Sequence, residues 1–327
     1  MQMRNKVVWV FFHQYPAVVA SYRLSGILPA KYLKIKKAIF LEKDNPRDLL
    51  NGMKPDVLIF AKPFHRNAVK LAKEAKNKNI KVIVTNDDWN FVDDTEKMRE
   101  INNIMTDVAI LSDAVVVKTK TAAKIVKKNT GIIPEVISDC LEFETKELIN
   151  KINYPFELAW FGNSANLDTL LFGLLEIEES NLLVNLTIIT NYSDYKDYLY
   201  NKINKLNLKN ISIKFLEWTL SFYKKLEDVE IVIIPYISDK RRLVKSTSRI
   251  IESMNLGKFV ITSTMPFNLE LKKYCYLGHI GEGLKWVKEN QDKALQIAKS
   301  GNDYAQKNYK VKKISNCWDQ LINKISI

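Results

Sequence analysis

Short apolar runs alternate with amphipathic stretches along the whole chain, and this alternation constrains the fold more than any other feature of the sequence. The runs have the length and composition of strands that are buried on both faces, as parallel sheets require. The stretches between them place apolar residues at helical spacing, as Ala68, Leu71 and Ala75 do within residues 67–76. The pattern predicts a series of βαβ units and therefore doubly wound α/β sheets.

The series runs twice, on either side of a polar stretch at residues 144–154 that ends at Pro155 and is typical of a linker. In the first half the predicted strands are residues 6–12, 37–41, 56–60, 81–85, 114–117 and 135–137. In the second half they are residues 156–161, 183–190, 211–215, 230–235 and 258–262, with helices at 167–176, 195–205 and 246–255. Apolar residues at helical spacing from about Val311 predict a final helix.

This organisation predicts two Rossmann-like doubly wound domains, at residues 1–147 and 155–310, that face each other across a cleft. A closing helix at 311–327 is expected to pack back toward the first domain. The length of 327 residues agrees with two domains of about 150 residues each. Ligands of open α/β sheets bind outside the carboxyl ends of the strands, so the cleft is the expected site.

The cysteines and the first apolar run indicate a compartment. Cys140, Cys275 and Cys317 are far apart and form neither a disulfide framework nor a pair at zinc-ligand spacing. The run from Val7 to Phe12 is too short for a signal peptide or a membrane span, and we interpret it as a buried strand. We expect a protein of the reducing cytoplasm.

The chain is basic, with a formal net charge of +13 from 50 Lys and Arg against 37 Asp and Glu. Such an excess favours polyanionic partners, such as nucleic acid or an anionic membrane surface. Because the excess is mostly lysine in a chain also rich in Ile and Asn, a solvated lysine-rich face is the competing interpretation. The cluster at Lys240, Arg241 and Arg242 is the candidate contact with DNA or membrane.

The best-known nucleotide-binding signatures do not occur in the sequence. Neither half carries a GxGxxG fingerprint or a GxxxxGK[ST] phosphate loop, so classical NAD binding and Walker-type ATP hydrolysis are disfavoured. Gly162 and Asn163 directly follow the predicted strand at 156–161. A glycine at a strand end is a weak sign of close backbone approach to a ligand.

The stretch KSTSRIIESMNLGKFVI, at residues 245–261, combines cations with a predicted helix start. Ser246 or Thr247 is expected to cap a helix whose free N–H groups and dipole attract anions. Lys245 adds a point charge just before the helix. A phosphate group fits this end of the helix.

Two further side chains extend that interpretation. Arg249 lies within the first turn of the predicted helix, where its guanidinium fork suits phosphate oxygens. Glu252 follows at i+3, and a carboxylate accepts hydrogen bonds from paired ribose hydroxyls. The set suits a nucleoside diphosphate. An ordinary capped helix with Arg249 and Glu252 as a surface ion pair explains the spacing equally well.

Longer stretches resemble one enzyme class. VEIVIIPYISDKRRLVKSTSRIIESMNLGKFVITS resembles the donor-binding segment of the GT-B glycosyltransferases, especially the retaining family 4 type, in which a strand that ends in proline precedes a loop and an E-(A/S)-M-x-x-G helix-to-strand step. Three further segments match the family: DAVVVKTKTAAKIVKKNTGIIPEVISDCLE, LAWFGN and FLEWTLSFYKKLEDVEIVIIP. They occur along the chain in the order in which the family has them. Together these matches cover most of the chain.

The resemblance implies a site and a reaction. It implies that Glu252 contacts the donor ribose, that Lys245, Ser246 and Thr247 lie at the diphosphate, and that Gly162 and Asn163 face the donor phosphates. Lys245 and Arg249 would then neutralise the leaving diphosphate. It also implies no bound metal and no cofactor beyond a UDP-, GDP-, ADP- or dTDP-sugar.

The sequence departs from the family pattern at several places, and one of them is the lack of the family's glycine-rich acceptor loop in the first domain. Val244 stands where the family often has the first of two glutamates, and residues 138–140, Ser-Asp-Cys, replace its PNG. The first domain has TNDDWNF where the family has a histidine after the fourth strand. These departures leave the donor sugar and the acceptor open.

The acceptor side would be formed by residues that follow strands of the first domain, because binding residues concentrate there. The candidates that line the cleft are His13, Tyr15, Arg23, Asp88 and Trp89. Of these, Arg23 is the candidate partner for an anionic acceptor or the donor phosphate. Asp87 and Asp88 as a metal pair are disfavoured, since adjacent carboxylates after a strand are more often a helix cap or a loop.

We therefore expect a glycosyltransferase, hexosyl or pentosyl, that retains anomeric configuration. A surface glycan or lipid-linked intermediate is the first acceptor hypothesis, with peripheral contact at the inner membrane face through basic patches. The second is a DNA-modifying glycosyltransferase, viral in origin, that acts on a flipped modified base. The third is a binding protein that kept the fold and lost catalysis, as Val244 suggests.

Overall fold

The structure is a computed structural model that describes residues 6–86, 88–143, 145 and 148–326. The chain divides into two compact units, which are described separately. Unit 1 takes Met1–Glu142, Asp239–Thr247 and Asn308–Ile327, and unit 2 takes Phe143–Ser238 and Ser248–Lys307. The short segment Asp239–Thr247 falls inside the predicted second domain by sequence, yet it groups with unit 1.

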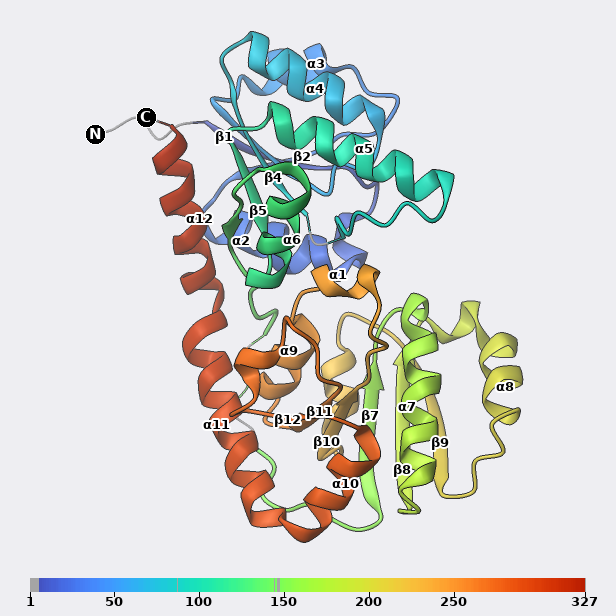
Figure 1. Cartoon of the computed structure of the whole chain (residues 1–327). Coiled ribbons are helices and arrows are strands. Elements are labelled where there is room, and N and C mark those ends of the chain that lie inside the picture. Colours follow the sequence, from blue (N-terminus) through green and yellow to red (C-terminus); the bar gives the residue numbers. More distant parts are fainter. Residues whose placement is uncertain (1–5, 87, 144, 146–147, 327) are drawn as a thin grey trace. The chain divides into compact units, whose positions relative to one another are not determined.

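Unit 1 is built on a six-stranded parallel sheet with the order β2-β1-β3-β4-β5-β6 (Figure 1). Its strands are β1 (Val7–Phe11), β2 (Lys36–Ile39), β3 (Val57–Ala61), β4 (Lys81–Thr85), β5 (Ala114–Val117) and β6 (Glu135–Val136). In the central strands nearly every residue is buried, as the continuous apolar runs require for a sheet that is covered on both faces.

Helices cover both faces of this sheet. They are α1 (Ala20–Tyr22), α2 (Leu28–Tyr32), α3 (Pro46–Met53), α4 (Arg66–Asn77), α5 (Glu96–Leu111), α6 (Lys120–Thr130) and α12 (Val311–Ile325). Alternate strand residues point to opposite faces. Val8 and Leu58 pack in one core with α3 to α6, whereas Trp9 packs in a second core with α2 and α12. In Figure 1, α3, α4 and α5 lie side by side over the first of these faces.

Unit 2 repeats the architecture with a second six-stranded parallel sheet, in the order β12-β11-β10-β7-β8-β9 (Figure 1). Its strands are β7 (Phe156–Phe161), β8 (Val184–Thr190), β9 (Ile211–Glu217), β10 (Ile231–Ile234), β11 (Phe259–Thr262) and β12 (Tyr276–Leu277). Its helices are α7 (Leu167–Glu179), α8 (Lys196–Asn204), α9 (Ser248–Asn255), α10 (Ile280–Glu289) and α11 (Gln291–Tyr309). The apolar stripes of α7, α8, α10 and α11 share one core with β7, β8, β10 and β11.

The predicted α/β fold, with two doubly wound sheets and a closing helix, is confirmed. Every predicted strand is present, with ends that differ by at most two residues. The two-residue edge strand β12 is additional.

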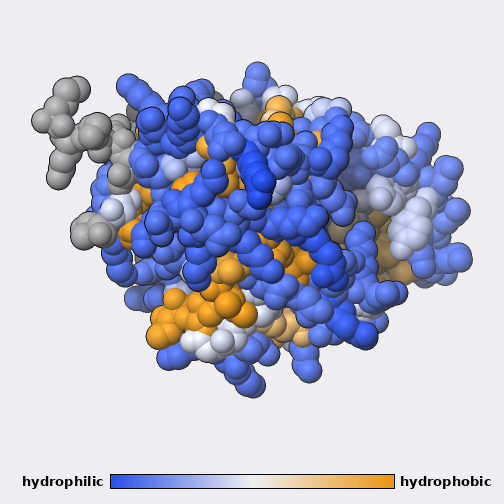
Figure 2. Space-filling view, turned by 90° about the horizontal axis from the view of Figure 1, so that it is seen from above, coloured by the Kyte–Doolittle hydropathy of each residue, from blue (hydrophilic) through white to orange (hydrophobic). Residues whose placement is uncertain are grey.

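The surface is largely polar. Figure 2 shows one face that is mostly hydrophilic, with hydrophobic residues gathered in small groups. Within the described part of the chain, no helix combines the length and the apolar character needed to cross a membrane.

Candidate active site

The start of α9 in unit 2 is where the sequence predicts a phosphate site. The helix begins at Ser248, two residues later than the predicted start at Ser246, and Thr247 directly precedes it. The preceding residues instead belong to the segment Asp239–Thr247, which includes the short helix η6 (Lys240–Val244). The dipole of α9 gives this end of the helix a partial positive charge, which suits an anion.

Arg249 lies in the first turn of α9 and points to the end of the neighbouring strand β7. Its Nη1 donates a hydrogen bond to the carbonyl oxygen of Phe161, at 3.4 Å. Its guanidinium lies 5.4 Å from the ring centroid of Tyr236, which follows β10. The planar guanidinium is therefore fixed in orientation near three neighbouring elements, as a phosphate-binding arginine should be.

Gly162 lies against that guanidinium. A Cβ atom at Gly162 would come within 3.1 Å of Arg249 Nη1 and 3.2 Å of the buried Trp160 ring. The side chain of the next residue, Asn163, accepts a hydrogen bond from the backbone N–H of Ala165, at 2.9 Å. The predicted donor residues Gly162 and Arg249 are thus brought together within unit 2.

Glu252 is buried in α9, with 7% of its surface exposed. This is not the position of the surface ion pair that the spacing of Arg249 and Glu252 also allowed. A buried carboxylate is costly unless it is paired or hydrogen-bonded, and Glu252 does interact with its surroundings in the structure.

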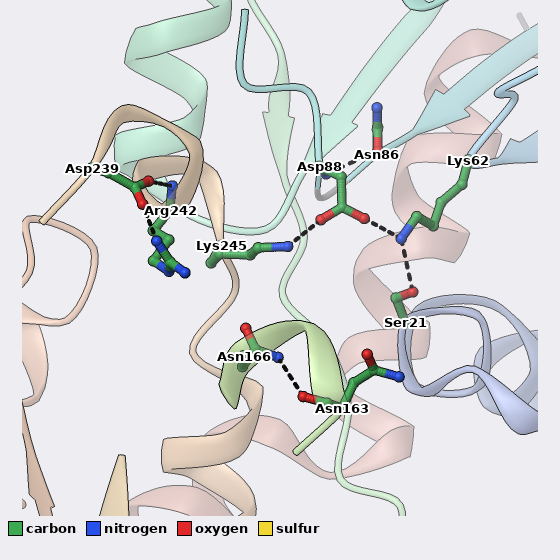
Figure 3. Close-up of polar contacts among 9 residues, drawn as sticks. All are labelled: Ser21, Lys62, Asn86, Asp88, Asn163, Asn166, Asp239, Arg242 and Lys245. Atoms are coloured by element: carbon green, nitrogen blue, oxygen red, sulfur yellow. Dashed lines mark hydrogen bonds and ion pairs between the residues drawn. The ribbon is translucent and has the colours of Figure 1, made fainter. Parts of the chain in front are cut away.

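A second cluster lies in unit 1, around Asp88 (Figure 3). Lys245 Nζ contacts Asp88 Oδ1 at 2.5 Å, and Lys62 Nζ forms a shorter ion pair with Asp88 Oδ2. Lys62 Nζ also donates to Ser21 Oγ, at 3.1 Å. The backbone N–H of Asp88 donates to Asn86 Oδ1, at 3.0 Å, which fixes the loop that carries the carboxylate.

Electrostatics keep this carboxylate ionised. Burial alone would raise the pKa of Asp88, but the charges and hydrogen bonds of Lys62 and Lys245 outweigh burial and hold that pKa well below its usual range. Asp88 is therefore a permanent anion near neutral pH, between two ammonium groups.

Sequence reasoning missed Lys62. The residue directly follows β3, as Asp88 follows β4, and the carboxyl ends of parallel strands meet at one edge of a sheet. The same rule selected Asp88, in the loop TNDDWNF after β4. Applied to FAKPF at the end of β3, it would also have selected Lys62. Its backbone φ of 51° lies in the left-handed region, which no sequence pattern indicated.

The other acceptor-side candidates are also in unit 1. Arg23 is buried and engaged, with Nε donating to Glu142 Oε1 at 2.6 Å and Nη2 donating to Glu142 Oε2 at 3.0 Å. Trp89 is buried and packs on Phe91. Tyr15 is 62% exposed, and its backbone N–H donates to His13 Nδ1 at 3.0 Å. Arg23 thus has a bidentate protein partner where the sequence predicted an anionic ligand.

The basic cluster in the segment Asp239–Thr247 is partly neutralised within unit 1. Arg241 pairs with Asp94, and Arg242 pairs with Asp239. Lys240 is exposed. Ion pairing reduces the positive charge that these arginines offer to a phosphate backbone.

Val244 occupies the position of the family's first glutamate, and its environment gives a physical reason for the change. Its side chain is 2% exposed and packs in the core of unit 1 with residues of the sheet and α6. A glutamate there would bury an unpaired charge.

Metal binding receives no support from the part of the chain that the structure describes, where no three His, Cys, Asp or Glu side chains gather as ligands. Asp87, the other half of the disfavoured Asp87–Asp88 pair, lies outside the described residues.

Comparison with solved structures identifies the fold. The chain is similar to TarM, with a TM-score of 0.65 at 16% identity over 85% of this chain, and it spans 57% of the length of TarM. It is similar over 98% of its length, and 99% of the other chain, to a glycosyltransferase from Rickettsia africae ESF-5, with a TM-score of 0.65 at 12% identity. The chain is also similar to a structure described as trehalose-6-phosphate from E. coli bound with UDP-2-fluoro glucose. The TM-score is 0.64 at 8% identity, over 98% of this chain and 99% of that one.

These similarities show that the chain has the GT-B fold of glycosyltransferases, as the sequence resemblance implied. TarM from S. aureus has also been solved with UDP and α-GlcNAc-glycerol. No family model matches the chain, and no curated protein matches it.

Proposed function

We propose that the chain is a glycosyltransferase that moves a sugar from a nucleotide diphosphate sugar to an acceptor. The observation that carries this proposal is the start of α9, where the oriented guanidinium of Arg249 lies beside Gly162 at the end of β7 and where the helix dipole also attracts anions. The sequence order of the donor segment and the GT-B fold support the same conclusion.

In this proposal the start of α9, with Ser246 and Thr247, binds the diphosphate, and Glu252 binds the ribose. Arg249 stabilises the charge that develops on the leaving diphosphate, so most of the catalysis is electrostatic. Uracil is the proposed base, since similar solved structures hold UDP or a UDP-sugar. A surface glycan or lipid-linked sugar is the proposed acceptor.

We also propose that the reaction proceeds with retention. The resemblance of the donor segment at residues 229–263 to that of the retaining family 4 type supports this. NMR of the first sugar released from a donor of known anomeric configuration tests it. A released sugar of opposite configuration would refute retention.

The first experiment measures ligand stabilisation of the full chain by thermal unfolding. UDP at 100 times its Kd is expected to add about 2.7 kcal/mol to the free energy of unfolding, whereas NAD adds nothing. GDP, ADP and dTDP complete the panel and identify the base. If none of the four diphosphates stabilises the protein at millimolar concentration, the proposed function is refuted.

The second experiment separates binding from catalysis in donor hydrolysis. Glu252→Gln removes a charged hydrogen bond present in substrate and transition state alike, so UDP affinity should fall by about 1.5 to 3 kcal/mol while kcat survives. Arg249→Met should lower kcat more than it raises KM, by a factor on the order of 100. Lys73→Met, at an exposed position on α4, is the control. Wild-type kinetics in both site variants would mean that α9 is merely a structural helix.

Lys245 is tested separately. Its predicted place at the diphosphate stays a prediction, and its ion pair with Asp88 supports the role argued below. If Lys245 serves the diphosphate, Lys245→Ala slows donor hydrolysis. If it serves the acceptor, the same variant slows transfer but leaves hydrolysis unchanged.

A further inference from the structure

The cluster around Asp88 has more positive than negative charge. Lys62 and Lys245 place two ammonium groups on one carboxylate, which leaves a local charge of +1, and Ser21 adds a hydroxyl group (Figure 3). All the contacts lie within unit 1 and come from α1, the ends of β3 and β4, and the segment Asp239–Thr247. A purely structural ion pair needs one cation, so the second needs an explanation.

Lys62 is held in place at a cost. Its φ of 51° lies in the left-handed region, which is unfavourable for a residue with a side chain. Its backbone N–H donates to the carbonyl oxygen of Thr85 at 3.0 Å, and its ammonium lies 5.3 Å from the ring centroid of Phe64. Strain that the surrounding structure maintains is typical of functional positions.

The cluster is open to solvent on one side. The Lys62 side chain is 11% exposed, whereas Asp88 is 31% and Lys245 is 42% exposed. Of the two lysines, Lys245 therefore has the more mobile side chain. Among the described residues its ammonium, with three N–H donors, contacts the Asp88 carboxylate. Because Lys62 remains paired with Asp88, Lys245 can turn to another anion without leaving the Asp88 carboxylate unpaired.

We propose that Lys62, Lys245 and Ser21 bind a negatively charged group of the acceptor, a phosphate or a carboxylate, and that Asp88 is the resident anion with which this group competes. The word acceptor rests on the proposed function, but the anion site does not. Lys245 moves from Asp88 to the incoming anion, while Lys62 and Ser21 bind it from the buried side. Arg23 does not take this role, because Glu142 already binds its guanidinium.

The first test uses inorganic phosphate as the probe, titrated by calorimetry against the full chain at constant ionic strength, with UDP saturating so that the donor site is filled. Lys62→Met should weaken phosphate binding by about tenfold, and Ser21→Ala by less. Lys73→Met is the control for the loss of one surface charge. Asp88→Asn should strengthen phosphate binding, because it removes the competing anion.

That opposite sign is the decisive result. If Asp88 and the lysines form a structural network only, Asp88→Asn weakens or abolishes whatever phosphate binding exists, and the proposal is refuted. Equal phosphate affinity in wild type, Lys62→Met and Lys73→Met refutes it too. If Asp88→Asn does not fold, the comparison of Lys62→Met and Ser21→Ala with Lys73→Met still decides.

The second test uses transfer from a UDP-sugar to paired acceptors. The rates with glycerol 3-phosphate and with glycerol are compared to detect a preference for a phosphate. The rates with methyl glucuronide and with methyl glucoside are compared to detect a preference for a carboxylate. The charged member of one pair should have a kcat/KM about tenfold higher, and Lys62→Met should remove that preference. Equal use of charged and neutral acceptors overturns the acceptor assignment. Absence of UDP binding counts against the proposed function alone, and phosphate titrated without UDP then still tests the anion site.

Discussion

Gly281, near the start of α10, lies against the backbone of α7, and replacing it tests how these two helices pack. A Cβ atom at Gly281 would lie 2.1 Å from the carbonyl oxygen of Glu176, whereas ordinary contacts begin near 3.4 Å. The shortfall of 1.3 Å (3.4 − 2.1) falls between two backbones, so no rotamer change relieves it. The start of α10 must move away from α7.

That movement breaks a specific contact. Glu176 Oε2 accepts a hydrogen bond from the backbone N–H of Ile280, at 2.7 Å, and caps the start of α10. Loss of this charged hydrogen bond costs about 1.5 to 3 kcal/mol, and overpacking adds about 1 to 3 kcal/mol. The higher helix propensity of alanine offsets less than about 1 kcal/mol of this loss in the free energy of unfolding. Gly281→Ala should therefore destabilise unit 2 by about 3 to 5 kcal/mol.

Hydrogen exchange measured peptide by peptide assigns the effect to a unit. Gly281→Ala should reduce protection in β11 and α10 and leave β1 and β3 unchanged. Gly52→Ala is the matched control, because a Cβ at Gly52, in α3, meets nothing within 4 Å. It should stabilise unit 1 by about 0.5 to 1 kcal/mol. A Gly281→Ala protein within 0.5 kcal/mol of wild type in unit 2 would show that α7 and α10 do not pack as described.

Two more predictions follow from titratable groups. The pKa of Asp88 is lower in the folded protein than in the unfolded chain, so its contribution to stability is present above the unfolded pKa and is lost as pH falls through the folded pKa. Asp88→Asn should therefore flatten the acid arm of the stability curve of unit 1, which is the loss of stability at low pH. An unchanged acid arm would argue against the two ion pairs. Burial raises the pKa of Cys275 to about 12, so at neutral pH a thiol reagent should label the half-buried Cys317 first, and labelling of Cys275 in the folded protein would contradict its burial.

Local pattern was enough to predict the fold. The strands at 57–61 and 231–234 are continuous apolar runs, and such runs remain readable in one sequence because burial on both faces selects apolar residues at every position. α9 was also predicted from a local pattern, which consists of apolar residues at helical spacing followed by a glycine. Its start was placed two residues early, because Ser246 and Thr247 look like caps in sequence.

The candidate sites depend on partners that are distant in sequence. Arg23 was predicted to bind an anion, and in the structure it binds Glu142, 119 residues away. Lys245 was predicted from its neighbours at the helix start, and its ion pair with Asp88 spans 157 residues. No local pattern encodes such pairings. Spacing could therefore name candidate residues, but it could not indicate which of them have charged partners within the protein.

The segment Asp239–Thr247 links the two proposed sites through the chain itself. It leaves unit 2 after β10, groups with unit 1 through Val244 and Lys245, and returns to unit 2 at Ser248, the first residue of α9. A diphosphate that binds Ser246 and Thr247 acts on the same segment as an anion that draws Lys245 away from Asp88. The two binding free energies should then be coupled.

Linkage makes this coupling testable without an acceptor. UDP should change the Kd for inorganic phosphate by the same factor by which phosphate changes the Kd for UDP, because coupling free energies are reciprocal. A factor of about 5 or more is typical of genuine coupling. Val244→Ala, which weakens the anchoring of the segment in the core of unit 1, should reduce that factor, whereas Lys73→Met should not. Phosphate and UDP affinities that are independent in the wild type would show that the segment transmits nothing between its two ends.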